Sequence, residues 1–138
     1  MPSGIDLILA DHEMVNELFA EFDANQDAAT IGLVIAALKA HDEAEQAALY
    51  PMVGTLLGDL DLVQRSETAH SMIKKQFDLI ATLEGPPLVA AFKELQQLVT
   101  AHVADEEKNL LPKLAETATP QQLEALGARI LQAKQRGG

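Results

Sequence analysis

Apolar residues recur at intervals of three and four along most of the chain, the spacing that places them on one face of an α-helix. The first such stretch begins at Ser3, a suitable N-cap, and runs to about residue 22. The second begins near Thr30 and frays near Gly58, and Pro51 should kink or loosen it because proline has no backbone N–H group to donate. The pattern therefore predicts two long amphipathic helices in the first half of the chain.

Three more helices are predicted in the second half. The third opens at Asp59 or Asp61, and Gly85-Pro86-Pro87 is the clearest break before the fourth, which Pro112 kinks or ends. A short fifth helix runs from Thr119-Pro120-Gln121-Gln122 to about residue 134, with residues 135–138 as a frayed tail. Its start combines an N-cap, a proline in the first turn and a glutamine three residues after the cap.

The composition agrees with an all-α fold. Alanine, leucine, glutamate and glutamine are abundant, and aromatic residues make up only 4% of the 138 residues, which favours helix over strand. Amphipathic helices joined by short turns pack best as an antiparallel up-down-up-down four-helix bundle, here followed by a short C-terminal fifth helix. We therefore expect residues 1–115 to form the bundle with its functional site, and residues 116–138 to form the C-terminal helix and tail.

Polar residues interrupt the apolar face of every helix of the predicted bundle. A His-x-x-x-Glu pair occurs twice, and residues four apart lie above one another on the same helical face. The third predicted stripe holds a histidine flanked by a glutamate and a lysine. The residues concerned are His12, then His41 with Glu45, then Glu67, His70 and Lys74, then His102 with Glu106. In an antiparallel bundle with a rise of about 1.5 Å per residue, the four histidines fall at similar depth.

Burying these groups without partners would be very costly, whereas a metal ion neutralises carboxylates and accepts nitrogen lone pairs. The chain contains no cysteine, so any metal must use nitrogen and oxygen ligands. Such a donor set in a bundle core suits iron or manganese, and a carboxylate bridge suits two ions. Any single histidine could instead be a hydrogen-bonded core residue, but four at one depth favour a metal site.

The same residues carry a resemblance to a known family, the hemerythrin-like proteins with an HHE cation-binding domain. The resemblance covers about residues 4–115 and rests on these segments: Asp11-His12, His41-x-x-x-Glu45 with Leu49-Tyr50-Pro51, His70, and His102-x-x-x-Glu106-Glu107 with Leu111-Pro112-Lys113-Leu114. It implies two non-haem iron ions with an oxo or hydroxo bridge. In that arrangement His12 and His41 hold one iron, His70 and His102 hold the other, and Glu45 and Glu106 bridge them. One position stays open for a small ligand.

The chain departs from the oxygen-carrying members of that family on the third helix. Lys74 stands where the carriers have a second histidine, one turn after His70. Glu67 could replace the missing ligand or form a salt bridge with Lys74 or Arg65. Tyr50 could approach the irons from the second helix or pack at the end of the bundle. We expect Lys74 to point outward or to pair with Glu67, because a lysine beside a metal must lose its proton or be paired.

The missing histidine favours redox chemistry over reversible oxygen carriage. The resemblance and this departure together predict decomposition of hydrogen peroxide in a catalase-like cycle. The alternative is a non-enzymatic protein that binds or senses dioxygen or nitric oxide, or that stores iron. A third possibility, a scaffold that has lost its metal, is disfavoured because all six core ligands are present.

The net charge and the length of the apolar runs limit which classes of partner the protein can bind. A formal net charge of −11 argues against nucleic acid and against anionic membrane surfaces. The N-terminus lacks the basic and apolar segments of a signal peptide, and the longest apolar run, residues 31–38, is too short to span a membrane. We therefore expect a cytoplasmic protein, monomeric or weakly dimeric, whose partner is a small ligand.

Overall fold

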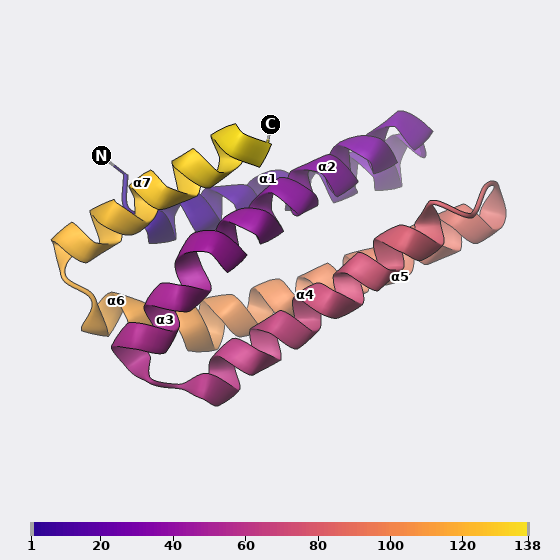
Figure 1. Cartoon of the computed structure of the whole chain (residues 1–138). Coiled ribbons are helices and arrows are strands. Elements are labelled where there is room, and N and C mark those ends of the chain that lie inside the picture. Colours follow the sequence, from indigo (N-terminus) through magenta and orange to yellow (C-terminus); the bar gives the residue numbers. More distant parts are fainter. Residues whose placement is uncertain (1, 138) are drawn as a thin grey trace.

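The computed structural model describes residues 2–137, which form helices joined by short connections (Figure 1). The elements are α1 (Gly4–Asn25), α2 (Ala28–Ala44), η1 (Glu45–Leu49), α3 (Tyr50–Leu57), α4 (Leu60–Ile80), α5 (Pro86–Asp105), η2 (Glu106–Leu110), α6 (Leu111–Thr117) and α7 (Pro120–Gly137). The described residues contain no strand, so the predicted all-α bundle is confirmed. None of these helices combines the length and the apolar character needed to cross a lipid bilayer.

Two antiparallel hairpins make up the bundle. In the first hairpin α1 packs against α2, which continues through η1 into α3; in the second hairpin α4 packs against α5, which continues through η2 into α6. The last helix, α7, lies along the first hairpin and contacts α1, α2 and η1 (Figure 1). The end of the bundle that carries α3 and α6 is therefore thicker than the opposite end.

Side-chain caps explain where several helices begin. Ser3 accepts a hydrogen bond from the backbone N–H of the third residue of α1, as predicted, and Asp59 caps α4 in the same way. The cap of α2 is Asp27 rather than the predicted Thr30, which is buried within the helix. Thr119 and Gln122 exchange hydrogen bonds of 2.8 and 3.1 Å between backbone and side chain, which completes the predicted capping box of α7.

The two expected proline kinks are π-helical turns. In η1 the N–H of Tyr50 donates to the carbonyl of Glu45, and in η2 the N–H of Leu111 donates to the carbonyl of Glu106. A proline, Pro51 or Pro112, follows each wide turn directly and has no N–H with which to continue the α-helical ladder. Single π turns of this kind occur frequently at functional sites, and each one here begins with the glutamate of a His-x-x-x-Glu pair.

A polar layer divides the apolar core into two clusters. One cluster lies at the end with α3, α6 and α7 and includes Leu49, Val53, Leu110, Leu114, Leu126 and Ile130. The other fills the opposite half of the hairpins and includes Phe19, Phe22, Leu38, Ile73, Phe92 and Leu95. Along each long helix the histidine stands between members of the two clusters, for example His12 between Ile8 and Val15.

The predicted stripe of the third helix was wrong in phase. The buried residues of α4 are Leu62, Ser66, His70, Ile73, Phe77 and Ile80. Glu67 and Lys74, which were expected on the buried face, are exposed, as is Leu60. The predicted stripe ran through Leu60, Val63, Glu67, His70, Lys74, Phe77 and Ala81. The two stripes share His70 and Phe77, but only the true one brings Ile73 and Ile80 into the core. Burial of two more large aliphatic side chains outweighs the polar spacing that suggested the other phase.

Candidate metal centre

All four histidines meet in the polar layer with their Nε2 atoms directed to its middle. His12 and His41 come from α1 and α2, and His70 and His102 come from α4 and α5. Each is buried, because the helical phase that buries the neighbouring aliphatic side chains also turns the imidazole inward. Glu45 and Glu106, at the first positions of the two π turns, are 0% and 1% exposed. Sequence reasoning named all six residues, and the structure brings them together.

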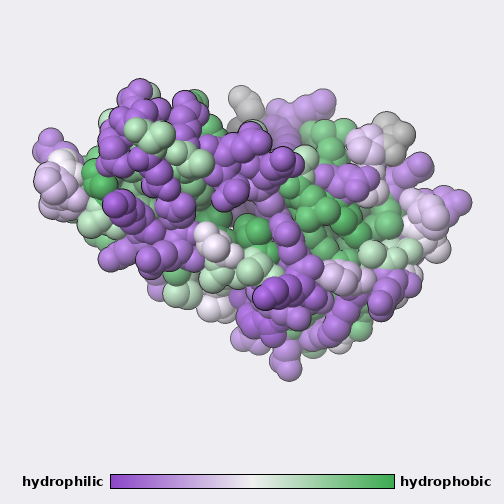
Figure 2. All heavy atoms as spheres, turned by 180° about the vertical axis from the view of Figure 1, so that it is seen from behind, coloured by the Kyte–Doolittle hydropathy of each residue, from purple (hydrophilic) through white to green (hydrophobic). Residues whose placement is uncertain are grey.

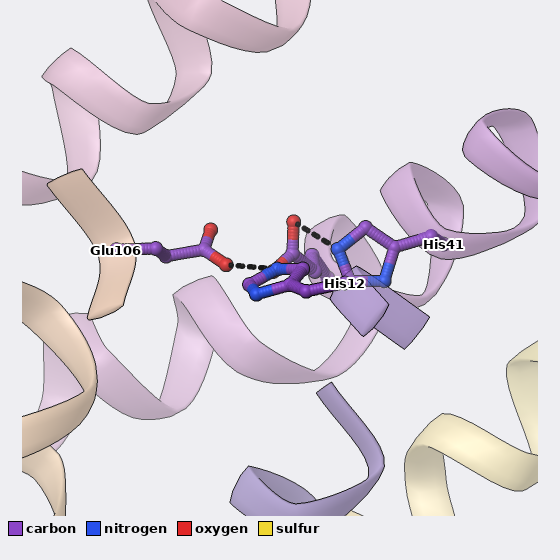
Figure 3. Close-up of side chains that lie close together, drawn as sticks. His12, His41 and Glu106 are labelled. Atoms are coloured by element: carbon purple, nitrogen blue, oxygen red, sulfur yellow. Dashed lines mark ion pairs between the residues drawn. The ribbon is translucent and has the colours of Figure 1, made fainter. Parts of the chain in front are cut away.

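Short contacts join each histidine to a glutamate. Within one chain segment, Nε2 of His41 lies 3.2 Å from Oε1 of Glu45, and Nε2 of His102 lies 3.2 Å from Oε2 of Glu106. Between hairpins, Nε2 of His12 lies 3.1 Å from Oε1 of Glu106, and Nε2 of His70 lies 3.0 Å from Oε1 of Glu45. Figure 3 shows the side chains of His12, His41 and Glu106 directed toward one another.

The six residues form two overlapping groups of four ligand atoms. The first donor group is His12, His41, Glu45 and Glu106, and the second donor group is Glu45, His70, His102 and Glu106. In each group the ligand atoms lie within 4.8 Å of one another. Each hairpin thus supplies three donors to its own group and one glutamate to the other group, so both glutamates belong to both.

These residues fit a metal ion. Nε2 of His12, Nε2 of His41, Oε2 of Glu45 and Oε1 of Glu106 are buried without a hydrogen-bond partner. Buried polar atoms of this kind are costly, and several at one point indicate a ligand. Imidazole nitrogens and carboxylate oxygens without a thiolate are the donors that iron and manganese accept in helical bundles. The layer therefore has the chemistry of a cation site.

The pKa values of the buried groups also favour a cation at this site. Burial alone lowers the pKa of His102, but hydrogen bonds and charge from Glu106 and Glu45 outweigh it and raise that pKa to about 10. His41 follows the same pattern, since burial is opposed by Glu45 and Asp11, and its pKa is raised well above the usual value. Burial raises the pKa of Glu45, yet His41, Glu106 and His102 together hold it well below the usual value. Positive charge is favoured at this point, whether from protons or from a metal ion.

A sequence model described as the hemerythrin HHE cation binding domain matches residues 3–114. The chain belongs to the hemerythrin HHE cation-binding domain family. The hemerythrin-like domain also resembles the crystal structure of an HHE cation binding domain-containing protein from Mycobacterium kansasii, with a TM-score of 0.82. That likeness covers 99% of this chain and 90% of the other at 17% identity, and it shows a shared fold.

One curated relative, named "DNA nickase", comes from Nostoc sp.. It is 30% identical to this hemerythrin-like domain in an alignment of 135 residues that covers 94% of the chain. The chain spans 38% of the length of that relative.

The outer ring nitrogens of three histidines in the hemerythrin-like centre have partners of their own. Nδ1 of His41 donates to Asp11 and Nδ1 of His12 donates to Glu107, each at 2.8 Å, while the side-chain amide of Gln46 lies 3.2 Å from Nδ1 of His70. Such outer partners fix the orientation of a ligand imidazole. Glu107 belongs to a segment that carries the family resemblance, whereas Gln46 was missed because a lone amide carries no motif.

A second missed residue comes from α7. Nζ of Lys134 donates to both carboxylate oxygens of Asp11, 123 positions away in the sequence. Burial raises the pKa of Asp11, but hydrogen bonds and charge from His41 and Lys134 hold it below the usual value. Only the packing of α7 on the first hairpin brings Lys134 to this place, so no local pattern could have indicated it.

Tyr50 lies beside the second donor group. Its phenol oxygen is 2.8 Å from Nε2 of His70, 3.0 Å from Oε2 of Glu106 and 3.3 Å from Oε1 of Glu45. Burial, followed by the negative charges of Glu45 and Glu106, raises the pKa of Tyr50, so the phenol keeps its proton unless a cation is nearby. Of the two alternatives drawn from the sequence, the structure places Tyr50 at the centre, although its ring also packs in the adjoining apolar cluster.

Glu67 and Lys74 are not brought to the centre. Both are exposed and line a surface hollow of about 390 Å³ that also reaches Asp42, Gln46 and His70. Lys74 points outward, as expected. Arg65, the other partner suggested for Glu67, instead forms two hydrogen bonds of 2.8 Å with Asp105. The oxygen nearest to the second donor group from outside it is thus that of Tyr50, and Glu67 plays no part in either group.

Proposed function

We propose that this hemerythrin-like domain binds two non-haem iron ions and decomposes hydrogen peroxide. The observation that carries the proposal is the pair of overlapping donor groups that share Glu45 and Glu106. In this assignment His12 and His41 would hold one ion, His70 and His102 would hold the other, and Glu45 and Glu106 would serve both. Paired carboxylates in a helical bundle are the donor arrangement of dinuclear iron sites. When bound, the two ions would supply the redox capacity that peroxide decomposition needs.

The side chains around the donors favour a reactive site on the side of His70. Tyr50 keeps its phenol proton among buried acceptors and lies 2.8 Å from Nε2 of His70. It can donate a hydrogen bond to a small oxidant, or act as an oxygen ligand where a neighbouring cation displaces the proton. Lys74 is exposed, and the buried side chains of Tyr50 and Asp42, the latter 3.5 Å from Nε2 of His70, complete the surroundings of the second donor group.

A small ligand can reach His70 through the surface hollow beside Lys74, and a second cavity leads to the side of His12. A cavity of about 550 Å³ between α1 and α5 reaches His12 and Glu107, and Val15, Phe19 and Val99 are among its apolar wall residues. Figure 2 shows the face turned away from the viewer in Figure 1, where apolar residues lie in a hollow between hydrophilic ones. Apolar walls admit small uncharged molecules such as hydrogen peroxide, dioxygen or nitric oxide and hold back ions.

The same apolar cavity supports a second candidate, non-enzymatic binding of dioxygen or nitric oxide. Its volume of about 550 Å³ leaves room for a diatomic gas as well as for a peroxide. Although the Nostoc relative is named a DNA nickase, we do not propose that this chain acts on DNA. Its net charge of −11 would repel the negatively charged phosphate backbone.

The test combines metal content with reactivity. Protein purified without chelator, or reconstituted with ferrous iron under anaerobic conditions, is expected to hold two iron ions per chain and to evolve oxygen from hydrogen peroxide. The matched control is Glu67→Gln, which removes one exposed carboxylate outside both donor groups. Failure to bind iron, or zinc as the bound metal, would overturn the proposal. Two irons with a long-lived oxygen adduct and untouched peroxide would select the binding function instead.

A further inference from the structure

The last helix packs on the bundle through an apolar stripe and through close approaches at two glycines, Gly4 of α1 and Gly127 of α7. Leu126, Ile130 and Ala133 of α7 are buried in the same cluster as Leu49 and Tyr50. A Cβ atom added at Gly127 would lie 2.6 Å from the carbonyl oxygen of Pro2, so only glycine allows this close approach. The backbone of α7 therefore packs directly against the start of α1.

Lys134 follows directly after this stripe and reaches Asp11. The contacts continue inward, because Asp11 accepts from Nδ1 of His41, and Nε2 of His41 faces Glu45 in the first donor group. The side chain of Asp11 is only 11% exposed and that of Lys134 is 29% exposed, so the ion pair is largely shielded from water. Without the ammonium group, Asp11 would be a largely buried carboxylate free to turn toward solvent and away from His41.

The second donor group lacks this support. Nδ1 of His70 faces the neutral amide of Gln46, and the residue before His70, which corresponds to Asp11 before His12, is Ala69. Nothing in the described part of α7 forms an ion pair with the second hairpin. The two halves of the centre therefore differ in their outer contacts although their ligand atoms are alike.

We propose that α7 belongs to the metal centre, with Lys134 as a positioning residue that holds Asp11 against His41 and thereby selectively slows metal loss from the first donor group. The inference rests on the proposed function, since it needs a metal at the donor groups. The effect passes through one imidazole, so it concerns one of two ions.

The experiment measures the release of iron to a chelator from protein loaded with ferrous iron under anaerobic conditions. Outer partners of ligand histidines typically change metal affinity by about 10–100-fold, so Lys134→Met should accelerate one of two release phases by at least about 10-fold. Lys134→Arg keeps a cation within reach of Asp11 and should restore slow release. Arg129→Met is the matched control, because it removes an exposed positive charge from the same helix.

A double variant separates positioning from general stability. If Lys134 acts through Asp11, then Lys134→Met should add nothing to the release rate of Asp11→Asn, whereas a general loss of stability would accelerate both release phases. Acceleration of both phases, or full additivity in the double variant, would overturn the inference and leave two-iron binding intact. So would unchanged release from Lys134→Met. A wild-type protein that holds no iron would overturn the proposed function as well.

Discussion

The two nitrogens of each inward histidine have separate tasks. Nε2 faces the shared glutamates, while Nδ1 of His12 and of His41 donates outward to a carboxylate. The hydrogen bond at Nδ1 fixes the plane of each of these two rings and directs Nε2 toward the centre. The orientation of these two rings is therefore set by Glu107 of η2 and by Asp11 of α1, which Lys134 of α7 holds in turn.

The shared glutamates should matter more than any one histidine. Glu45→Ala or Glu106→Ala removes a donor from both groups and should lose both irons, whereas His12→Ala removes a donor from one group and should retain part of the metal. Iron per chain, measured after identical purification, checks this. The exposed Glu67→Ala is the control, and full iron occupancy in the Glu45 variant would contradict the assignment.

Stability of the metal-free and metal-loaded forms should change in opposite directions with pH. The pKa of His102 is raised from 6.5 to about 10 in the folded chain, so its stabilising contribution is complete below 6.5 and is lost as the pH rises through about 10. The metal-free melting temperature should therefore fall over that range. Metal requires neutral imidazole, so the same rise in pH should strengthen metal binding and stabilise the loaded form. Parallel slopes in thermal melts of the two forms would refute this picture.

At the scale of residues, the sequence was sufficient to predict which site residues lie together when they are one helical turn apart. His41 and Glu45 could be paired because four residues make one turn, and the same holds for His102 and Glu106. Lys134 could not be predicted because its partner depends on how a separate helix docks. Glu67 was expected at the site because it keeps helical spacing from His70, but that spacing leads to the exposed face of α4.

At the scale of elements, both π turns place a glutamate of the centre. The one-residue widening changes the phase of the helix, so that Leu49 and Tyr50, adjacent in sequence, are both buried. Pro51 and Pro112 predicted that the helices are irregular at these points. A proline is equally compatible with a kink, a break or a π turn, so the kind of irregularity could not be predicted. The helices themselves were predictable from apolar spacing and capping, whereas the kind of irregularity was not.

The docking of α7 allows a test with matched glycines. Gly127→Ala would bring a methyl group against backbone atoms of Pro2 and Gly4 and should destabilise the fold by about 1–3 kcal/mol. Gly32→Ala meets nothing within 4 Å on a helix surface and should stabilise it by about 0.5–1 kcal/mol. Thermal or denaturant unfolding of the metal-free proteins measures both. Equal effects of the two substitutions would mean that α7 is not seated closely on α1.

At the scale of the whole molecule, the centre joins the two hairpins. Each donor group takes three ligands from one hairpin and a glutamate from the other, so even one bound ion would link them. A ligand that binds only the folded state raises its stability by mass action. The general arrangement, four antiparallel helices with the histidines at one depth, followed from the topology. The contact of each glutamate with a histidine of the other hairpin could be seen only in the structure. Contacts between hairpins follow no regular spacing in the sequence.

The division of the core by the polar layer has a consequence for cooperativity. Two apolar clusters that share no buried side chain can open independently, each with its own free energy, when nothing joins them across the layer. Amide hydrogen exchange of the metal-free protein should thus show two groups of slow amides: those near Leu114 and Ile130, and those near Phe22 and Phe92. Iron should merge the two groups into one, making the chain a single folding unit. Identical protection in both groups before metal is added would rule this out.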